Sequence, residues 1–117
     1  ILMILGARVF TIERQRELFL KTKKLLPRLG YRPRFFYGDG YIGKEEFAPF
    51  DKINDTASAP YNPDALKDQL KVGGVMVIPV GETSAQRMMR LYKVAEGEFE
   101  VEDLGDCSFV PMLEDKV

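Results

Sequence analysis

The stretch Phe35–Pro60 constrains the fold most, because it holds two strand-like runs that each end in small residues. The first run ends at Gly38-Asp39-Gly40, and the second opens at Phe50 and ends in the segment 56–60, TASAP. Glycines beside a carboxylate at a strand end let the backbone pass close to a ligand. Asp and Gly are also ordinary turn residues, so the tripeptide alone favours a tight turn.

A third run shifts the balance towards a ligand site. The apolar run Val75–Val80 is typical of a buried strand, and it finishes at Gly81. Before it we expect a helix over Asn62–Leu70, capped by Asn62 with Pro63 in its first turn, and then a turn over Lys71–Gly74. Strand ends rich in small residues predict a ligand cleft at the carboxyl edge of an open α/β sheet.

Among the other predicted elements, strands and a helix alternate in the first part of the chain, and two strands pair as a hairpin in the last part. A helix over Gln15–Leu29, ended by Gly30, lies between two short strands. A hairpin turning at Glu96-Gly97 follows Gly81, and a last short strand closes the chain. This order predicts one domain of 117 residues with a mostly parallel sheet and an antiparallel edge. The predicted strands outside the central stretch are Arg8–Glu13, Arg34–Tyr37, Gln86–Val94, Phe99–Leu104 and Ser108–Met112.

The composition excludes several classes of binding and catalysis. With 17 basic and 18 acidic residues, the net charge of −1 gives no field that favours nucleic acid or an anionic membrane. No apolar run approaches the roughly 20 residues of a membrane-spanning helix. The single cysteine, Cys107, allows no internal disulfide and suits a reducing cytoplasm. The chain has no histidine, so catalysis must rest on positioning, on carboxylates or on a cofactor.

Six short segments, taken in order, resemble the protein-L-isoaspartate O-methyltransferases. These are class I S-adenosylmethionine-dependent enzymes that repair isoaspartyl residues in damaged proteins. The segments are VFTIER at 9–14, GDG at 38–40, FAPFDKI at 47–53, TASAP at 56–60, LKVGGVMVIPVG at 70–81 and FVPM at 109–112. The resemblance covers Gly6–Leu113 and implies a Rossmann-like α/β sheet, mostly parallel, with a C-terminal antiparallel hairpin.

The resemblance also implies roles for individual residues. Glu13 would accept hydrogen bonds from the ribose hydroxyls of the cofactor, and Asp39 from its adenine amino group. Gly40 would let the adenine ring approach, and Thr56 would lie near the methionine end. The substrate-binding residues implied for the isoaspartyl peptide are Pro60, Pro79, Val80 and Gly81, and a family glutamine falls at Gln86.

The implied chemistry needs no catalytic side chain and no metal. The nucleophile is the substrate's own carboxylate, which is ionised at neutral pH. S-adenosylmethionine supplies an activated methyl group and leaves as S-adenosylhomocysteine, so the protein aligns the two reactants and excludes water.

The chain departs from the family pattern in two ways. The family's first strand and glycine-rich loop would lie upstream of Ile1, and that strand sits between Val9–Glu13 and Phe50–Thr56. We therefore expect two unpaired strand edges, impaired activity in the isolated chain, and completion by another segment or by a homo-oligomer. Asn54 and Asp55 fall where the family has apolar residues in a buried strand. This favours a strand that is frayed or exposed here, or an altered sequence, over a buried partner for Asp55.

Two other functions stay open. The chain could be another class I methyltransferase that acts on a small molecule or a different protein, although the TASAP and IPVG segments argue against it. It could also be a non-catalytic domain that associates with itself through exposed strand edges.

Overall fold

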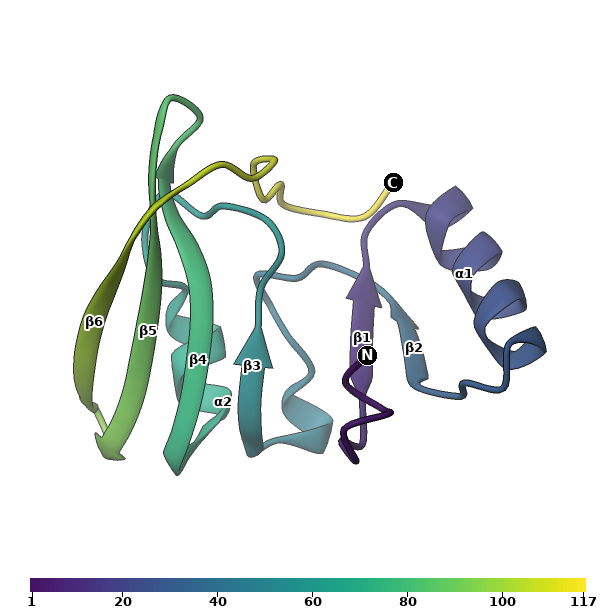
Figure 1. The fold of residues 1–117 in the computed structure, drawn as a ribbon, viewed down its shortest axis with the longest axis horizontal. Coiled ribbons are helices and arrows are strands. Elements are labelled where there is room, and N and C mark those ends of the chain that lie inside the picture. Colours follow the sequence, from purple (N-terminus) through teal and green to yellow (C-terminus); the bar gives the residue numbers. More distant parts are fainter. The chain divides into compact units, whose positions relative to one another are not determined.

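The structure, a computed structural model, describes residues 1–117 and divides them into two compact units (Figure 1). Unit 1 comprises Ile1–Gly40 together with Glu114–Val117, and unit 2 comprises Tyr41–Leu113. Each unit is described by itself below. That residues 1–117 form one partial methyltransferase domain stays a prediction.

Unit 1 is a strand–helix–strand segment with the last four residues of the chain. Strand β1 (Phe10–Glu13), helix α1 (Arg16–Arg28) and strand β2 (Arg34–Tyr37) follow the predicted order, and β1 and β2 are parallel. Phe19 of α1 stacks on Tyr37 of β2 with ring centroids 5.8 Å apart, which holds the helix against the strand pair. Gly30, at φ +89°, follows the helix as predicted.

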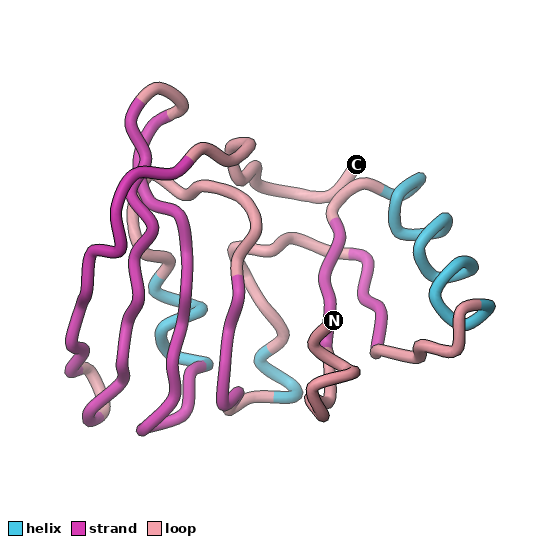
Figure 2. Tube along the Cα trace, viewed as in Figure 1, coloured by secondary structure: helices cyan, strands magenta, loops and turns pink.

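Unit 2 is a four-stranded sheet with one short helix and one 3-10 turn, η1 (Glu45–Phe47). The strand order is β3-β4-β5-β6, in which β3 and β4 are parallel and the other two pairs are antiparallel. Figure 2 shows the three long strands that form the predicted hairpin and its neighbour. The elements after η1 are β3 (Phe50–Asn54), α2 (Asp64–Gln69), β4 (Leu70–Glu82), β5 (Ala85–Ala95) and β6 (Glu98–Cys107).

The hydrophobic core lies in unit 2. Alternate residues of β4, Met76 and Ile78, are fully buried, as expected where successive side chains point to opposite faces of a sheet. Leu66 of α2 packs against this face, and unit 1 contains no buried residue. The six buried apolar residues are Ala59, Leu66, Leu70, Met76, Ile78 and Leu91.

Three local predictions were wrong. The predicted turn at Lys71–Gly74 is part of β4, because the chain continues as a strand through Gly73 at φ +86° with a register shift against β3. Helix α2 begins at Asp64 after Pro63, so Asn62 is not its cap and the buried Asn62 Oδ1 accepts no hydrogen bond. The predicted strand Ser108–Met112 is reduced to one isolated parallel bridge, between Ser58 and Pro111.

Four strands lie at sheet edges with a neighbour on one side only, namely β1, β2, β3 and β6. β1 pairs with β2 alone, and β3 pairs with β4 alone. β1 and β3 are the two strands that we expected to have unpaired edges.

Candidate functional site

Glu13 and Asp39, the two acids implied in cofactor binding, lie where the parallel strands β1 and β2 of unit 1 both finish. This carboxyl end of the strand pair is called its carboxyl edge. Glu13 is the last residue of β1 and pairs in register with Tyr37, the last residue of β2. The Gly38 N–H donates to the Glu13 carbonyl over 3.1 Å, so Asp39 and Gly40 follow directly beyond this edge. The structure therefore brings Glu13, Asp39 and Gly40 together at the carboxyl ends of β1 and β2.

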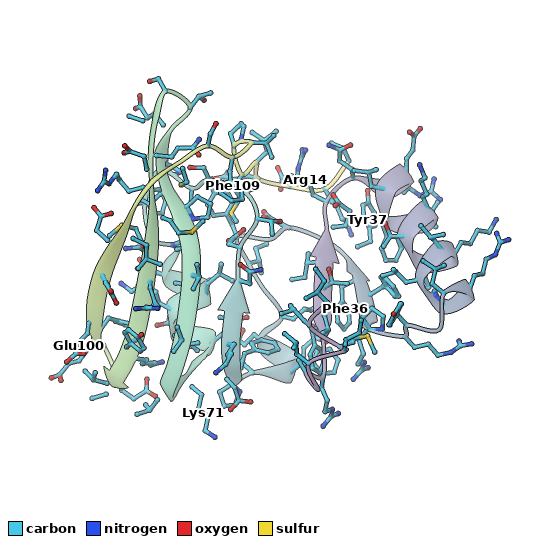
Figure 3. The ribbon with its side chains drawn as sticks, viewed as in Figure 1. Arg14, Phe36, Tyr37, Lys71, Glu100 and Phe109 are labelled. Atoms are coloured by element: carbon cyan, nitrogen blue, oxygen red, sulfur yellow. The ribbon has the colours of Figure 1, made fainter.

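The end of the chain lies against this edge, which no sequence pattern indicated. The Asp115 N–H donates to Asp39 Oδ2 over 2.9 Å, and Arg14 Nε donates to the Asp115 carbonyl over 2.9 Å. Val117 pairs with the backbone after β1, donating to the Arg14 carbonyl over 2.9 Å. Figure 3 labels Arg14 and Tyr37 at this edge, where Lys116 Nζ lies 5.0 Å from the centre of the Tyr37 ring.

Two carboxylates, those of Glu13 and Asp39, offer hydrogen-bond acceptors at this edge. An ionised carboxylate accepts hydrogen bonds and donates none. Recognition of a vicinal diol or of an amino group requires such an acceptor. Glu13 uses Oε1 to accept from the Gln15 N–H over 2.9 Å, which fixes the carboxylate at the strand end. No group of three or more Cys, Asp or Glu side chains is close enough to hold a metal ion.

Unit 2 contains a pocket of about 440 Å³ at the end of β4. Of the implied substrate-binding residues, Pro60 and Gly81 line it, whereas Pro79 is fully buried and does not. Val80 and Thr56 are also outside the lining. The lining residues are Ser58, Pro60, Gly81, Glu82, Thr83, Ser84, Gln86, Pro111 and Met112.

Backbone pairing brings the TASAP loop beside the end of β4. The Ala59 N–H donates to the Pro79 carbonyl over 3.0 Å, and the Gly81 N–H donates to the Ala59 carbonyl over 2.8 Å. Gly81 has φ +134°, and a Cβ there would lie 2.1 Å from the Ala85 carbonyl oxygen. Because any side chain would collide with the Ala85 carbonyl, only glycine lets the β4–β5 turn come this close. The absence of a side chain at Gly81 therefore sets the shape of the pocket here.

Two buried polar residues of the lining hold the segment after β6, Ser58 through its backbone and Gln86 through its side chain. Ser58 Oγ donates to the Gly81 carbonyl over 2.9 Å, and the backbone of Ser58 pairs with Val110 and Met112. Gln86 Nε2 donates to the Phe109 carbonyl over 2.9 Å, and the Phe109 N–H donates back to Gln86 Oε1 over 2.7 Å. Phe109 is labelled in Figure 3, in the segment that follows β6.

Asp55 has a pKa well above that of an ordinary aspartate. It follows β3 directly and is half-buried, and burial raises the pKa of its carboxyl from 3.8 to about 6 against the opposing effect of the Ala57 and Thr56 N–H groups. Its Oδ1 accepts from the Ala57 N–H over 3.4 Å. The frayed or exposed strand predicted here agrees with the structure, because β3 ends at the exposed Asn54 and Asp55 lies beyond the strand, only partly buried.

Comparison with known proteins decides the family. The model of the protein-L-isoaspartate(D-aspartate) O-methyltransferase family matches residues 2–117. The chain belongs to this family. Protein-L-isoaspartate O-methyltransferases of Cytophaga hutchinsonii and Christiangramia forsetii are 51% and 53% identical to it, over 97% and 99% of the chain. It spans about half the length of these curated relatives, 51% and 54%.

Solved structures of this family agree with the fold. A protein-L-isoaspartate O-methyltransferase of Plasmodium falciparum, in complex with S-adenosyl-L-homocysteine, matches with a TM-score of 0.75 and 26% identity over 92% of this chain and 53% of its own. A second protein-L-isoaspartate O-methyltransferase matches with a TM-score of 0.80 and 28% identity over 88% of this chain and 33% of its own. The fold is the predicted Rossmann-like α/β fold of the class I methyltransferases, with an antiparallel C-terminal hairpin. None of its helices has the length and apolar character needed to cross a membrane.

Proposed function

We propose that this chain takes part in methyl transfer from S-adenosylmethionine to the carboxylate of isoaspartyl residues in damaged proteins. The observation that carries the proposal is the pair of carboxylates, Glu13 and Asp39, at one edge of a parallel strand pair in a member of this family. The S-adenosyl-L-homocysteine bound by the Plasmodium falciparum relative supports the choice of cofactor.

Each implied residue has a distinct role in this proposal. Glu13 accepts from the ribose hydroxyls and Asp39 from the adenine amino group, while Gly40 leaves room for the ring. When bound, S-adenosylmethionine would supply an activated methyl group. The chain's own residues bind and orient, and none of them forms a bond to the methyl group.

On the substrate side, the proposal uses the pocket at the end of β4. Pro60 and Gly81 line it and present apolar surface and backbone to an isoaspartyl peptide, and Val80 continues the same strand. Pro79 supports this strand from the core instead of contacting the peptide. We place the protein in the cytoplasm, where its one cysteine stays reduced, and expect low turnover from the 117-residue chain alone.

Titration calorimetry with S-adenosylhomocysteine tests the cofactor side. We expect Glu13→Gln and Asp39→Asn each to weaken binding by about tenfold to a hundredfold, because a hydrogen bond to a charged group contributes about 1.5–3 kcal/mol. Glu17→Gln is the matched control, since Glu17 is an exposed acid on α1 and its substitution changes the charge equally. Unchanged affinity in both site variants would contradict the proposed site.

A second candidate function is non-catalytic self-association through strand edges. β1 and β3 each pair on one side only, and such edges are templates for a further strand. Sedimentation over a hundredfold range of protein concentration, which is roughly 2.7 kcal/mol in association free energy, tests this second function. A monomer at every concentration would rule this function out.

A further inference from the structure

Two buried glutamines of unit 2 hold backbone segments in the same way. Gln69 is 6% exposed and Gln86 is 4% exposed, and each side-chain amide donates one hydrogen bond and accepts another from the backbone. Gln69 Nε2 donates to the Ile42 carbonyl over 2.7 Å, and its Oε1 accepts from the Lys44 N–H over 2.9 Å. Gln86 does the same with both backbone groups of Phe109.

The two glutamines differ in what they hold. The segment held by Gln86 continues to Pro111 and Met112, which line the pocket at the end of β4. The residues held by Gln69 do not line that pocket. The two side chains thus have similar burial and the same hydrogen-bond pattern, but only Gln86 is attached to a pocket wall.

Gln86 is poorly suited to bind a ligand itself. Although it lies in the lining, it is almost fully buried, and both ends of its amide are already paired with Phe109. Its amide instead supplies the donor and acceptor that a neighbouring strand would supply, in a segment with only one isolated bridge. Ser58 provides the second attachment, because its backbone pairs with Val110 and Met112.

The geometry points to Gln86 as a positioning residue for peptide recognition: its amide fixes the segment Phe109–Met112 as one wall of the pocket. This inference rests on the proposed function, because the peptide that the wall would contact is the isoaspartyl substrate. Substrate affinity then depends on a side chain that does not touch the substrate. Affinity for the cofactor product should not depend on Gln86, because both hydrogen bonds of its amide go to Phe109 and none goes to a residue implied in cofactor binding.

The experiment compares three variants of the full chain with the unmodified protein. Gln86→Leu removes both hydrogen bonds, and Gln86→Glu keeps the acceptor for the Phe109 N–H but loses the donor. Gln69→Leu is the matched control. The measurements are the Kd of a fluorescent isoaspartyl peptide, with its aspartyl counterpart as reference, the Kd of S-adenosylhomocysteine, and amide exchange at Met112.

We expect both Gln86 variants to weaken isoaspartyl peptide binding by about tenfold, about 1.4 kcal/mol, because a pocket wall that is no longer held loses its fixed contacts with the peptide. Met112 amide exchange should accelerate in the same variants, although its own acceptor, the Ser58 carbonyl, is untouched. Gln69→Leu should lower the thermal midpoint as Gln86→Leu does and leave peptide affinity unchanged. S-adenosylhomocysteine affinity should be the same in all four proteins.

The outcomes separate failure of this inference from failure of the proposed function. Equal peptide affinity in the Gln86 variants and the unmodified protein overturns the positioning role and leaves the proposed function standing. Equal weakening in Gln69→Leu also overturns it, because the effect is then one of general stability. If the unmodified protein does not prefer the isoaspartyl peptide, the proposed substrate fails and this inference fails with it. Should Gln86→Leu not fold, Gln86→Glu decides.

Discussion

At the scale of single residues, Asp55 shows how position relative to a strand end sets the behaviour of a carboxyl group. It lies one residue beyond β3, and its carboxylate accepts from the N–H groups of Ala57 and Thr56. These bonds favour the ionised form, but burial disfavours it more, so the pKa rises to about 6. The folded protein therefore binds a proton at Asp55 more tightly than the unfolded chain does.

This difference predicts how stability depends on pH. Because the folded pKa is raised, the stabilisation by protonated Asp55 is complete below about pH 3.8 and is lost as the pH rises through about 6. Asp55→Asn keeps an acceptor for the Ala57 N–H and carries no charge. It should match the unmodified protein near pH 4 and be more stable by about 1–2 kcal/mol above pH 7, after allowing for solvent screening. Urea midpoints at both pH values measure this, and a variant less stable at pH 7.5 would contradict it.

At the scale of elements, the C-terminal end of helix α2 depends on a lysine of strand β5. Its last carbonyls have no partner within the helix, as at any helix end. Lys93 of β5 is 2% exposed, and its Nζ donates to the Lys67 and Asp68 carbonyls over 3.2 and 3.4 Å. The ammonium also lies 3.2 Å from Glu96 Oε2, so its charge is paired.

We expect Lys93→Met to destabilise the protein by about 1–3 kcal/mol, because it keeps the apolar length of the side chain and removes two hydrogen bonds from a charged donor to the Lys67 and Asp68 carbonyls. Lys71→Met is the control. Lys71 is exposed and pairs with Asp51 over 3.6 Å, so its loss should cost less than about 1 kcal/mol. Chemical denaturation of the two variants compares them directly, and equal midpoints would show that α2 does not need the lysine.

Elements whose signals lie within one short segment could be predicted from the sequence, and those that depend on pairing with distant residues could not. The strand–helix–strand order of unit 1 followed from the spacing of apolar residues and from Gly30, which are signals within one segment. Gly73 carried the same kind of signal and misled, because β3 pairs with β4 at Leu70 and again from Val75, on both sides of the glycine. The pairing of Gln86 with Phe109 depends on residues 23 positions apart, so no local pattern could give it.

At the scale of the whole molecule, burial is unequal between the two units. All six core residues belong to unit 2, and no residue of unit 1 is buried. The proposed nucleoside-binding acids therefore lie in the unit with less apolar burial, and the pocket proposed for the substrate lies in the unit with the core. Burial of apolar surface is the main favourable term in folding, so the two units should differ in local stability.

Amide hydrogen exchange of the intact chain measures this difference. We expect amides of β1 and β2 to exchange at least about a hundredfold faster than those of Met76, Ile78 and Leu91, because opening free energies range from near zero to the global value. Saturating S-adenosylhomocysteine should slow exchange at the ends of β1 and β2 and leave the β4–β5 pair unchanged, since a ligand stabilises the conformation that it binds. The β4–β5 pair is an internal control. Equal protection of both sheets without ligand would show that unit 1 is stabilised by more than the contacts described here.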